Sequence, residues 1–221
     1  MPIREKTILQ AVKHYQNKKA FLFDMDGLIF DTERLFMEQL AVVMKEQGYE
    51  LTREIYAETL GTCGSFLQEL MQSHYGSQYP FQEISQEADR RVRMVADTVG
   101  LTVKTGIPEV LSYLADRSVP CVVASSTRSD KVAFYLEKAG IAHYFRDIVG
   151  GEMAERSKPE PDIFLLASQK AGESPQDCVV LEDSENGVRA ALAAGCDVIC
   201  VPDLKVPSQQ VLQQVQAVVM P

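Results

Sequence analysis

The chain of 221 residues has 31 acidic and 22 basic side chains, a net charge of −9 at pH 7, and 46% hydrophobic residues. The negative charge disfavours nucleic acids and anionic membranes as partners, and the hydrophobic fraction is sufficient for one or two domains with a substantial core. No apolar run approaches the roughly 20 residues of a membrane span. The five cysteines form no Cys-x-x-Cys pair, and the start of the chain lacks a signal-peptide core, so we expect a cytoplasmic protein.

The first eighteen residues are predicted to form an extension ahead of the main fold. Ile8, Val12 and Tyr15 recur at helical spacing within residues 3–17. Such spacing is typical of an amphipathic helix. We therefore expect residues 1–18 to be an N-terminal extension that contains one helix.

The apolar run Ala20–Phe23 ends abruptly in Asp24, Met25, Asp26 and Gly27. A short apolar run that is bounded by a turn is typical of a buried strand. Side chains on a strand alternate, so Asp24 and Asp26 begin on the same side, and Gly27 permits a sharp turn and a close backbone approach to a ligand. Two carboxylates at the end of a buried strand repel each other and are costly to desolvate. We therefore expect a hard cation such as Mg²⁺, which prefers oxygen ligands, beside them.

The block from residue 33 to residue 100 has helical periodicity and no convincing strand. The turn Gly61-Thr62-Cys63-Gly64 divides this block, and the pattern predicts about four helices. An all-helical block that follows the first strand of an α/β sheet indicates a separate cap domain. The catalytic core would then comprise residues 19–32 and 101–221.

From residue 106 onward, short apolar runs alternate with helical patterns. Continuous apolar strands that alternate with helices indicate a mainly parallel sheet with helices on both faces. We therefore predict a Rossmann-like α/β core. The predicted strands are 121–124, 147–149, 178–181, 198–201 and 217–219, and the predicted helices are about 107–117, 128–139, 161–171 and 185–194.

Polar residues follow several of the apolar runs, at the strand ends where open α/β sheets bind their ligands. They are the hydroxyl run Ser125–Thr127, Lys158 in a later loop, and the acidic pair Glu182–Asp183. Taken singly, each has an ordinary interpretation: Ser126, Thr127 or Ser184 as a helix N-cap, and Lys158 as a solvated surface lysine. Together with the first acidic pair, however, they would converge on one edge of the sheet, which indicates a functional site.

This set of motifs resembles the haloacid dehalogenase superfamily, in particular its β-phosphoglucomutase-like phosphatases. The resemblance extends from residue 19 to residue 202 in the right order and includes the cap insertion. Four motifs in order are far more specific than any one of them. The matching segments are Asp24–Glu33, Ala124–Ser126, Ser157–Phe164, Leu181–Ser184 and Asn186–Ala191.

The resemblance implies hydrolysis of a phosphate ester through a covalent aspartyl phosphate. Asp24 is the implied nucleophile, and Asp26 is the implied general acid and base. Ser125 and Lys158 would hold the phosphoryl oxygens. Mg²⁺ would bind Asp24, the backbone carbonyl of Asp26, and Asp183.

The acidic pair Glu182–Asp183 and the surface near it raise two further expectations. Adjacent side chains diverge on a strand, so we prefer Asp183 as the direct metal ligand and place Glu182 behind it or across a bridging water. Arg128 would reach a sugar or nucleoside hydroxyl, although a solvent-facing Arg128 at a helix start stays open. The residues expected to contact the substrate are Gly27, Ser126, Arg128 and Asn186.

We expect a phosphatase that acts on a small phosphorylated metabolite, namely a sugar phosphate or a nucleotide-derived monophosphate. The alternative is a β-phosphoglucomutase-type mutase, which in that family carries a histidine early in the cap and an arginine that grips a second phosphate. The corresponding positions here are Phe36 and the loop Gly61–Gly64, which has no cation. A non-catalytic phosphosugar-binding protein is disfavoured, because the full set of implied catalytic residues is present. We expect a monomer, with neither nucleic acid nor membrane as a partner.

Overall fold

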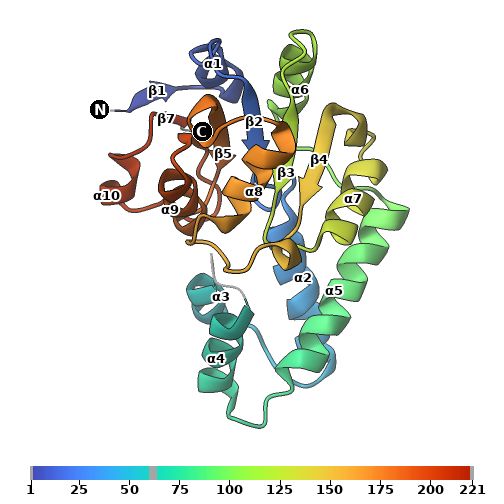
Figure 1. Cartoon of the computed structure of the whole chain (residues 1–221). Helices are drawn as coiled ribbons and strands as arrows, with labels where there is room; N and C mark the ends of the chain where they lie inside the picture. Colours follow the sequence, from blue (N-terminus) through green and yellow to red (C-terminus); the bar gives the residue numbers. More distant parts are fainter. Residues whose placement is uncertain (1, 60–63, 220–221) are drawn as a thin grey trace. The chain divides into compact units, whose positions relative to one another are not determined.

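The computed structural model describes residues 2–59 and 64–219, which divide into two units (Figure 1). One unit comprises Met1–Asp31 together with Leu101–Pro221, and the other comprises Thr32–Gly100. The first unit contains the strands and the second is helical. None of the described helices is both long enough and apolar enough to cross a membrane.

The first unit is built on a seven-stranded sheet in the order β1-β7-β6-β5-β2-β3-β4, and every neighbouring pair is parallel. From β2 the chain adds β3 and β4 on one side and then returns with β5 on the other side of β2. Such a reversal of strand order leaves a crevice at the carboxyl ends of the strands. The strands are β1 (Ile3–Glu5), β2 (Ala20–Phe23), β3 (Cys121–Ala124), β4 (Phe145–Val149), β5 (Cys178–Glu182), β6 (Asp197–Cys200) and β7 (Ala217–Val219).

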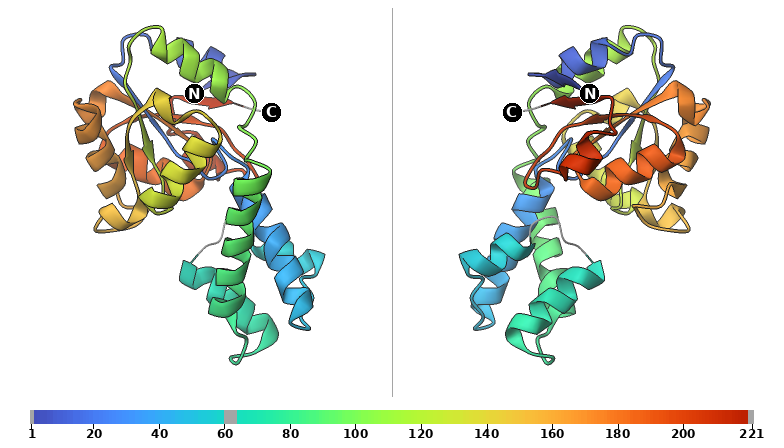
Figure 2. Two further views of the ribbon diagram at one scale, coloured as in Figure 1. Left: turned by 90° about the vertical axis from the view of Figure 1, so that its right-hand side faces the viewer. Right: turned by 90° about the vertical axis from the view of Figure 1, so that its left-hand side faces the viewer.

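Helices cover both faces of this sheet, as predicted (Figure 2). Leu22, Val122 and Val180 belong to the face whose core includes residues of α8 and α9. Phe21, which points to the opposite face, shares a small cavity with residues of α1 and α6. The helices of this unit are α1 (Ile8–Lys13), α6 (Ile107–Ala115), α7 (Ser129–Lys138), α8 (Asp162–Ala171), α9 (Glu185–Ala194) and α10 (Gln209–Leu212), with 3-10 turns at Ala142–Tyr144, Gly151–Met153 and Pro175–Asp177.

The start of the chain differs from the prediction of one helix over residues 3–17. Ile3–Glu5 form β1, which pairs in parallel with β7 at the edge of the sheet. The helix begins only at Ile8, because Thr7 forms a capping box with Gln10: the Thr7 hydroxyl accepts from the Gln10 N–H, and the Gln10 side chain accepts from the Thr7 N–H. The first residues are therefore part of the sheet unit.

The second unit has four helices in its described residues, the number that the sequence predicts. Its core consists mainly of apolar side chains of α2 and α5, among them Leu40, Met44 and Ile84. Three of the four residues of the predicted turn Gly61–Gly64, the loop that has no cation for a second phosphate, lie outside the described residues: they are residues 61–63. The helices are α2 (Thr32–Glu46), α3 (Arg53–Thr59), α4 (Gly64–Tyr75) and α5 (Phe81–Thr98).

The buried face of the central strand generates a stability prediction. Leu22 in β2 is fully buried, so Leu22→Ala is expected to lower the free energy of unfolding by about 2–5 kcal/mol through lost contacts and a residual cavity. Leu165→Ala is the control, because Leu165 on α8 is 45% exposed and its truncation should change stability by less than about 0.5 kcal/mol. Urea denaturation followed by circular dichroism measures both, and equal losses would contradict this assignment of the core.

Candidate active site

The strand register assembles the site at the carboxyl ends of β2, β3 and β5. Phe23 pairs with Leu181 of β5 and with Val123 of β3. Asp24, directly after β2, and Glu182, the last residue of β5, therefore follow at the same level, and the Asp24 N–H donates to the Leu181 carbonyl at 3.1 Å. The predicted convergence of polar residues at this edge follows from the parallel pairing.

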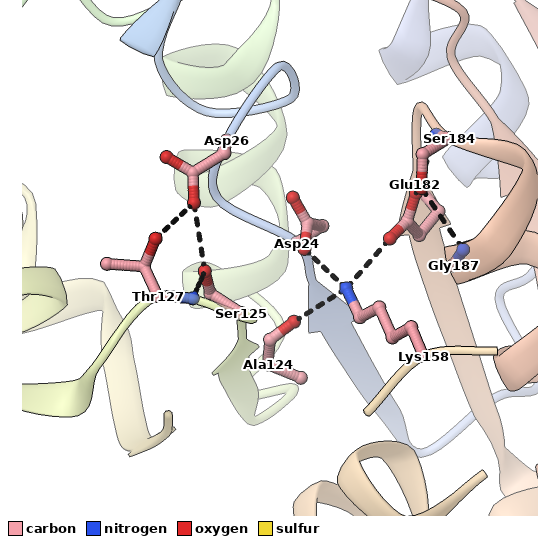
Figure 3. Close-up of polar contacts among 9 residues, drawn as sticks. All are labelled: Asp24, Asp26, Ala124, Ser125, Thr127, Lys158, Glu182, Ser184 and Gly187. Carbon is pink, nitrogen blue, oxygen red and sulfur yellow. Dashed lines mark hydrogen bonds and ion pairs between the residues drawn. The ribbon is translucent and has the colours of Figure 1, made fainter. Parts of the chain in front are cut away.

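Lys158 lies at the centre of the site (Figure 3). Its ammonium group donates to Asp24 Oδ1, to Glu182 Oε1 at 2.8 Å and to the Ala124 carbonyl at 3.3 Å. The Lys158 side chain is only 7% exposed, so the interpretation as a solvated surface lysine is wrong. A buried ammonium group with two carboxylate partners fixes the orientation of both acids.

Three carboxylates gather around this cation. Asp24, Glu182 and Asp183 each offer an oxygen, and these oxygens lie within 4.8 Å of one another. Burial raises the pKa of Asp24 to about 8, against the opposing effect of Lys158. Burial also raises the pKa of Asp183, and the neighbouring carboxylates add to the shift. Although burial lowers the pKa of Lys158, its two acidic partners outweigh that effect and raise it.

The charge of this cluster fits a divalent cation. When all three carboxylates are ionised, they and the ammonium group leave two negative charges, and all of the candidate ligand atoms are oxygens, as hard cations prefer. Gly27 fits the same requirement, because its φ of +83° is in the left-handed region and a Cβ there would lie 2.3 Å from Asp183 Oδ2. The backbone thus passes directly beside a candidate ligand, where no side chain has room.

Glu182 is held by the protein through both of its oxygens. Its Oε1 accepts from Lys158, and its Oε2 accepts from the N–H of Ser184 at 2.7 Å and from the Ser184 hydroxyl at 3.0 Å. Ser184 is also the predicted N-cap of α9, and its hydroxyl accepts from the Gly187 N–H at 3.1 Å. A Cβ at Gly187 would lie 1.7 Å from Glu182 Oε1, so α9 begins directly against this carboxylate.

Two hydroxyl groups hold the second aspartate of the pair (Figure 3). Asp26 Oδ2 accepts from the Ser125 hydroxyl at 3.1 Å and from the Thr127 hydroxyl at 2.7 Å. The helix cap predicted at Ser126 or Thr127 is wrong, because Arg128 is the N-cap residue of α7 and makes no side-chain cap bond. Thr127 belongs to the predicted hydroxyl run, but the sequence analysis gave it no role in the site, although its spacing of two from Ser125 could have placed both hydroxyls on one side.

The segment that follows β4 packs against the loop that carries these hydroxyls. A Cβ at Gly151, just after β4, would lie 2.3 Å from the carbonyl oxygen of Ser126. The Glu152 carboxylate accepts from the N–H of Ser129 at 3.1 Å and also from its hydroxyl, at the start of α7. Nothing in the sequence pattern indicated that Glu152 would supply this cap from another element.

The remaining predicted substrate contacts lie at the surface. The Arg128 side chain is 70% exposed and pairs with Asp130 at 3.1 Å, which is the solvent-facing alternative left open by the sequence. Ser126 and Asn186 are also exposed. The structure therefore brings together the predicted catalytic and metal-binding side chains, which are Asp24, Asp26, Ser125, Lys158, Glu182 and Asp183.

Comparison with known proteins independently supports the family resemblance that the motifs indicate. The family model described as haloacid dehalogenase-like hydrolase matches residues 21–201. The chain is 31% identical over 197 residues to the "Probable pseudouridine-5'-phosphatase" of Drosophila melanogaster, covering 86% of this chain and 84% of that one. It is 30% identical over 189 residues to the fructose-1-phosphate phosphatase YqaB of Escherichia coli (strain K12), covering 85% and 98%.

The fold has a close counterpart among solved structures. CbbY from Rhodobacter sphaeroides, crystallised in complex with phosphate, superposes with a TM-score of 0.77 at 25% identity, covering 91% of this chain and 93% of that one. The family match spans well over half of the chain, and it includes the segments that carry the buried acidic site. This confirms the resemblance drawn from the motifs. The chain belongs to the haloacid dehalogenase-like hydrolase family, within its β-phosphoglucomutase-like subgroup.

Proposed function

We propose that this protein is a Mg²⁺-dependent phosphatase that hydrolyses a small phosphorylated metabolite through an aspartyl phosphate. The observation that carries the proposal is the buried group in which Lys158 joins Asp24 to Glu182, with Asp183 beside them. The names of the relatives support the substrate class, since they include phosphatases of a sugar phosphate and of a nucleoside phosphate.

Asp24 is the proposed nucleophile. Its carboxylate oxygen forms a bond to phosphorus while the bond between phosphorus and the ester oxygen breaks. Only the ionised carboxylate attacks, and burial opposes ionisation by raising the pKa of Asp24 to about 8. The ammonium group of Lys158 opposes this shift and would also donate to the phosphoryl oxygens.

Asp26 is the proposed acid and base. The Ser125 and Thr127 hydroxyls both donate to Asp26 Oδ2 and hold the carboxyl group in place, and the protonated Asp26 would give its proton to the leaving oxygen. In the second step a water attacks phosphorus, gives its proton to Asp26, and releases Asp24. Ser125 would exchange its bond to Asp26 for one to a phosphoryl oxygen, and Thr127 would keep the acid in place.

Asp24, Asp183 and the backbone carbonyl of Asp26 would hold Mg²⁺. When bound, the ion supplies positive charge that offsets the charge of the phosphoryl oxygens. Both oxygens of Glu182 already accept from protein donors, which favours Asp183 over Glu182 as the direct ligand. Glu182 would then hold Lys158 in position.

Hydrolysis is preferred to the mutase reaction because a mutase must hold a second phosphate. The loop Gly61–Gly64 contains no cation, and Phe36, half-buried against the core of the helical unit, offers no acid or base. We propose a sugar phosphate or a nucleotide-derived monophosphate as the substrate. The monomeric state and the cytoplasmic location stay predictions.

Phosphate release tests the proposed function directly. A panel of sugar phosphates, nucleoside monophosphates and p-nitrophenyl phosphate should release phosphate with Mg²⁺ and not with EDTA. Asp24→Asn should lower kcat by more than about a thousandfold, as the loss of a nucleophile does. Asp177→Asn is the control, since this half-buried acid pairs with Lys19 near the start of β5, away from the site residues. Normal turnover by Asp24→Asn would refute the mechanism, and isomerisation of a sugar 1-phosphate without release would favour the mutase.

The affinity for Mg²⁺ is expected to rise with pH between about 6 and 8. Burial raises the pKa of Asp24 to about 8, so below that pH the metal must displace a proton. Displacing one proton gives up to about a tenfold gain in apparent affinity per pH unit. Calorimetric titration with MgCl₂ at pH 6, 7 and 8 measures this, and Asp24→Asn should reduce the dependence, leaving the part that comes from Asp183, whose pKa is also raised. A pH-independent affinity in the wild type would count against Asp24 as a ligand.

Gly27→Ala should weaken metal binding. The new Cβ would meet Asp183 Oδ2, and displacing a ligand or its support typically costs 10- to 100-fold in metal affinity. Gly195→Ala is the matched control: its φ of +85° imposes similar backbone strain of about 1–2 kcal/mol, but its nearest neighbour is Gln176 Nε2 at 3.7 Å. Calorimetry with MgCl₂ on both variants should show a loss for Gly27→Ala alone.

A further inference from the structure

Lys104 is a second cation at this edge of the sheet, and the proposed chemistry does not use it. Its ammonium group donates to the Gly27 carbonyl at 2.6 Å and forms an ion pair with Asp203 Oδ1 at 2.6 Å. Asp203 follows β6, and its other oxygen is buried without a hydrogen-bond partner in the described chain. Lys104 therefore links a mostly buried carboxylate to one particular peptide group.

That peptide belongs to the turn that follows the nucleophile strand. Within the turn, the Gly27 N–H donates to the Phe30 carbonyl at 2.9 Å. The segment of Lys104 binds the same turn twice more, because the Lys104 N–H donates to the Ile29 carbonyl at 2.8 Å and Val103 forms a β-bridge with Phe30. The side-chain bond to Gly27 is the one of these contacts that reaches the residue adjacent to Asp26.

The position of Gly27 affects the positions of two groups of the site. Its Cα faces Asp183, since a Cβ there would lie 2.3 Å from Asp183 Oδ2. Its N-terminal neighbour is Asp26, whose backbone carbonyl is a proposed metal ligand. A shift of the Gly27 peptide would therefore displace both Asp183 and Asp26.

We infer that Lys104 is a positioning residue for this site, fixing the Gly27 peptide and through it the metal ligands at Asp26 and Asp183. This inference rests on the proposed function, because it presupposes that the acidic site binds a metal. The role differs from that of Lys158, which contacts the carboxylates themselves. Lys104 acts through the backbone, with Asp203 holding its ammonium group in place.

The chain offers a matched control in Lys18. The Lys18 ammonium group donates to the Gln176 carbonyl at 2.6 Å and pairs with Asp197 Oδ2 at 2.8 Å. The side chains are 21% and 29% exposed in this pair and 27% and 13% exposed in the Lys104–Asp203 pair. Asp197 begins β6 and Asp203 follows it, so the two lysines make matching contacts at opposite ends of one strand.

The test compares Lys104→Met with Lys18→Met in the full-length chain. Thermal unfolding without metal should show similar losses of stability. Calorimetric titration with MgCl₂ should show a dissociation constant at least about tenfold higher for Lys104→Met alone, as expected for loss of a group that orients metal ligands. Its kcat for the best substrate of the panel should fall by a similar factor, with KM near the wild-type value because Ser125 and Lys158 are untouched.

Equal Mg²⁺ affinity and equal kcat in the two variants would overturn the inference. If Lys104→Met does not fold, Asp203→Asn, which keeps the side-chain size and removes the charge that holds Lys104, takes its place, with Asp197→Asn as its control. A weaker Mg²⁺ affinity for Asp203→Asn alone would support the inference, and equal affinities would overturn it. A wild type that neither binds Mg²⁺ nor releases phosphate would refute the proposed function as well, whereas an active wild type with an indifferent Lys104→Met would refute the role of Lys104 alone.

Discussion

The buried ammonium group of Lys158, shared between Asp24 and Glu182, is the interaction on which the rest of the site depends. Removing one partner of a buried ion pair costs about 3–5 kcal/mol, because the remaining charge is left without compensation in a medium that solvates it poorly. Lys158, Asp24 and Glu182 therefore depend on one another, because the two buried carboxylates share one cation. With Asp183 added and the acids ionised, the group carries more negative than positive charge. Its own electrostatics thus call for a further cation, which is the physical reason for connecting this site with a metal.

The strand order explains how Asp24 and Asp26, which both follow the short strand β2, have different partners. Because β2 lies between β3 and β5, Asp24 has the acidic residue Glu182 of β5 as a neighbour, with Lys158 bonded to both, whereas the hydroxyl groups that hold Asp26 come from the loop after β3. A nucleophile and an acid have to be kept apart electrostatically, and different neighbours achieve this more easily than a single shared environment. The strand ends and the loops at this edge, including the loop before α8 that carries Lys158, together supply both environments.

Much of this arrangement could be predicted from the sequence, because apolar runs reveal the strands. Contacts that no such run encodes could not be predicted. Continuous apolar runs define buried parallel strands, and parallel strands place the residues that follow them at one edge, so Asp24, Ser125 and Asp183 were found together. The prediction was wrong or silent where partners come from distant parts of the chain without a pattern. The edge strand β1 (Ile3–Glu5) has no apolar run and depends on pairing with β7. The cap that Glu152 provides, and the bond from Lys104 to the Gly27 carbonyl, likewise exist only in the folded chain.

Lys158 and Lys104, the two lysines at this edge, contribute differently to binding an anionic substrate and a metal. The chain carries a net charge of −9, so its overall field does not attract an anionic phosphate ester, and positive charge at the site has to be local. Lys158 supplies such charge in direct contact with the acids, but a single ammonium group does not balance three ionised carboxylates. Any further positive charge has to come from a bound cation, whose affinity depends on how well its oxygen ligands are oriented. Lys104, tied to Asp203 and to the Gly27 peptide, supplies that orientation from behind and leaves the acids themselves available to the metal.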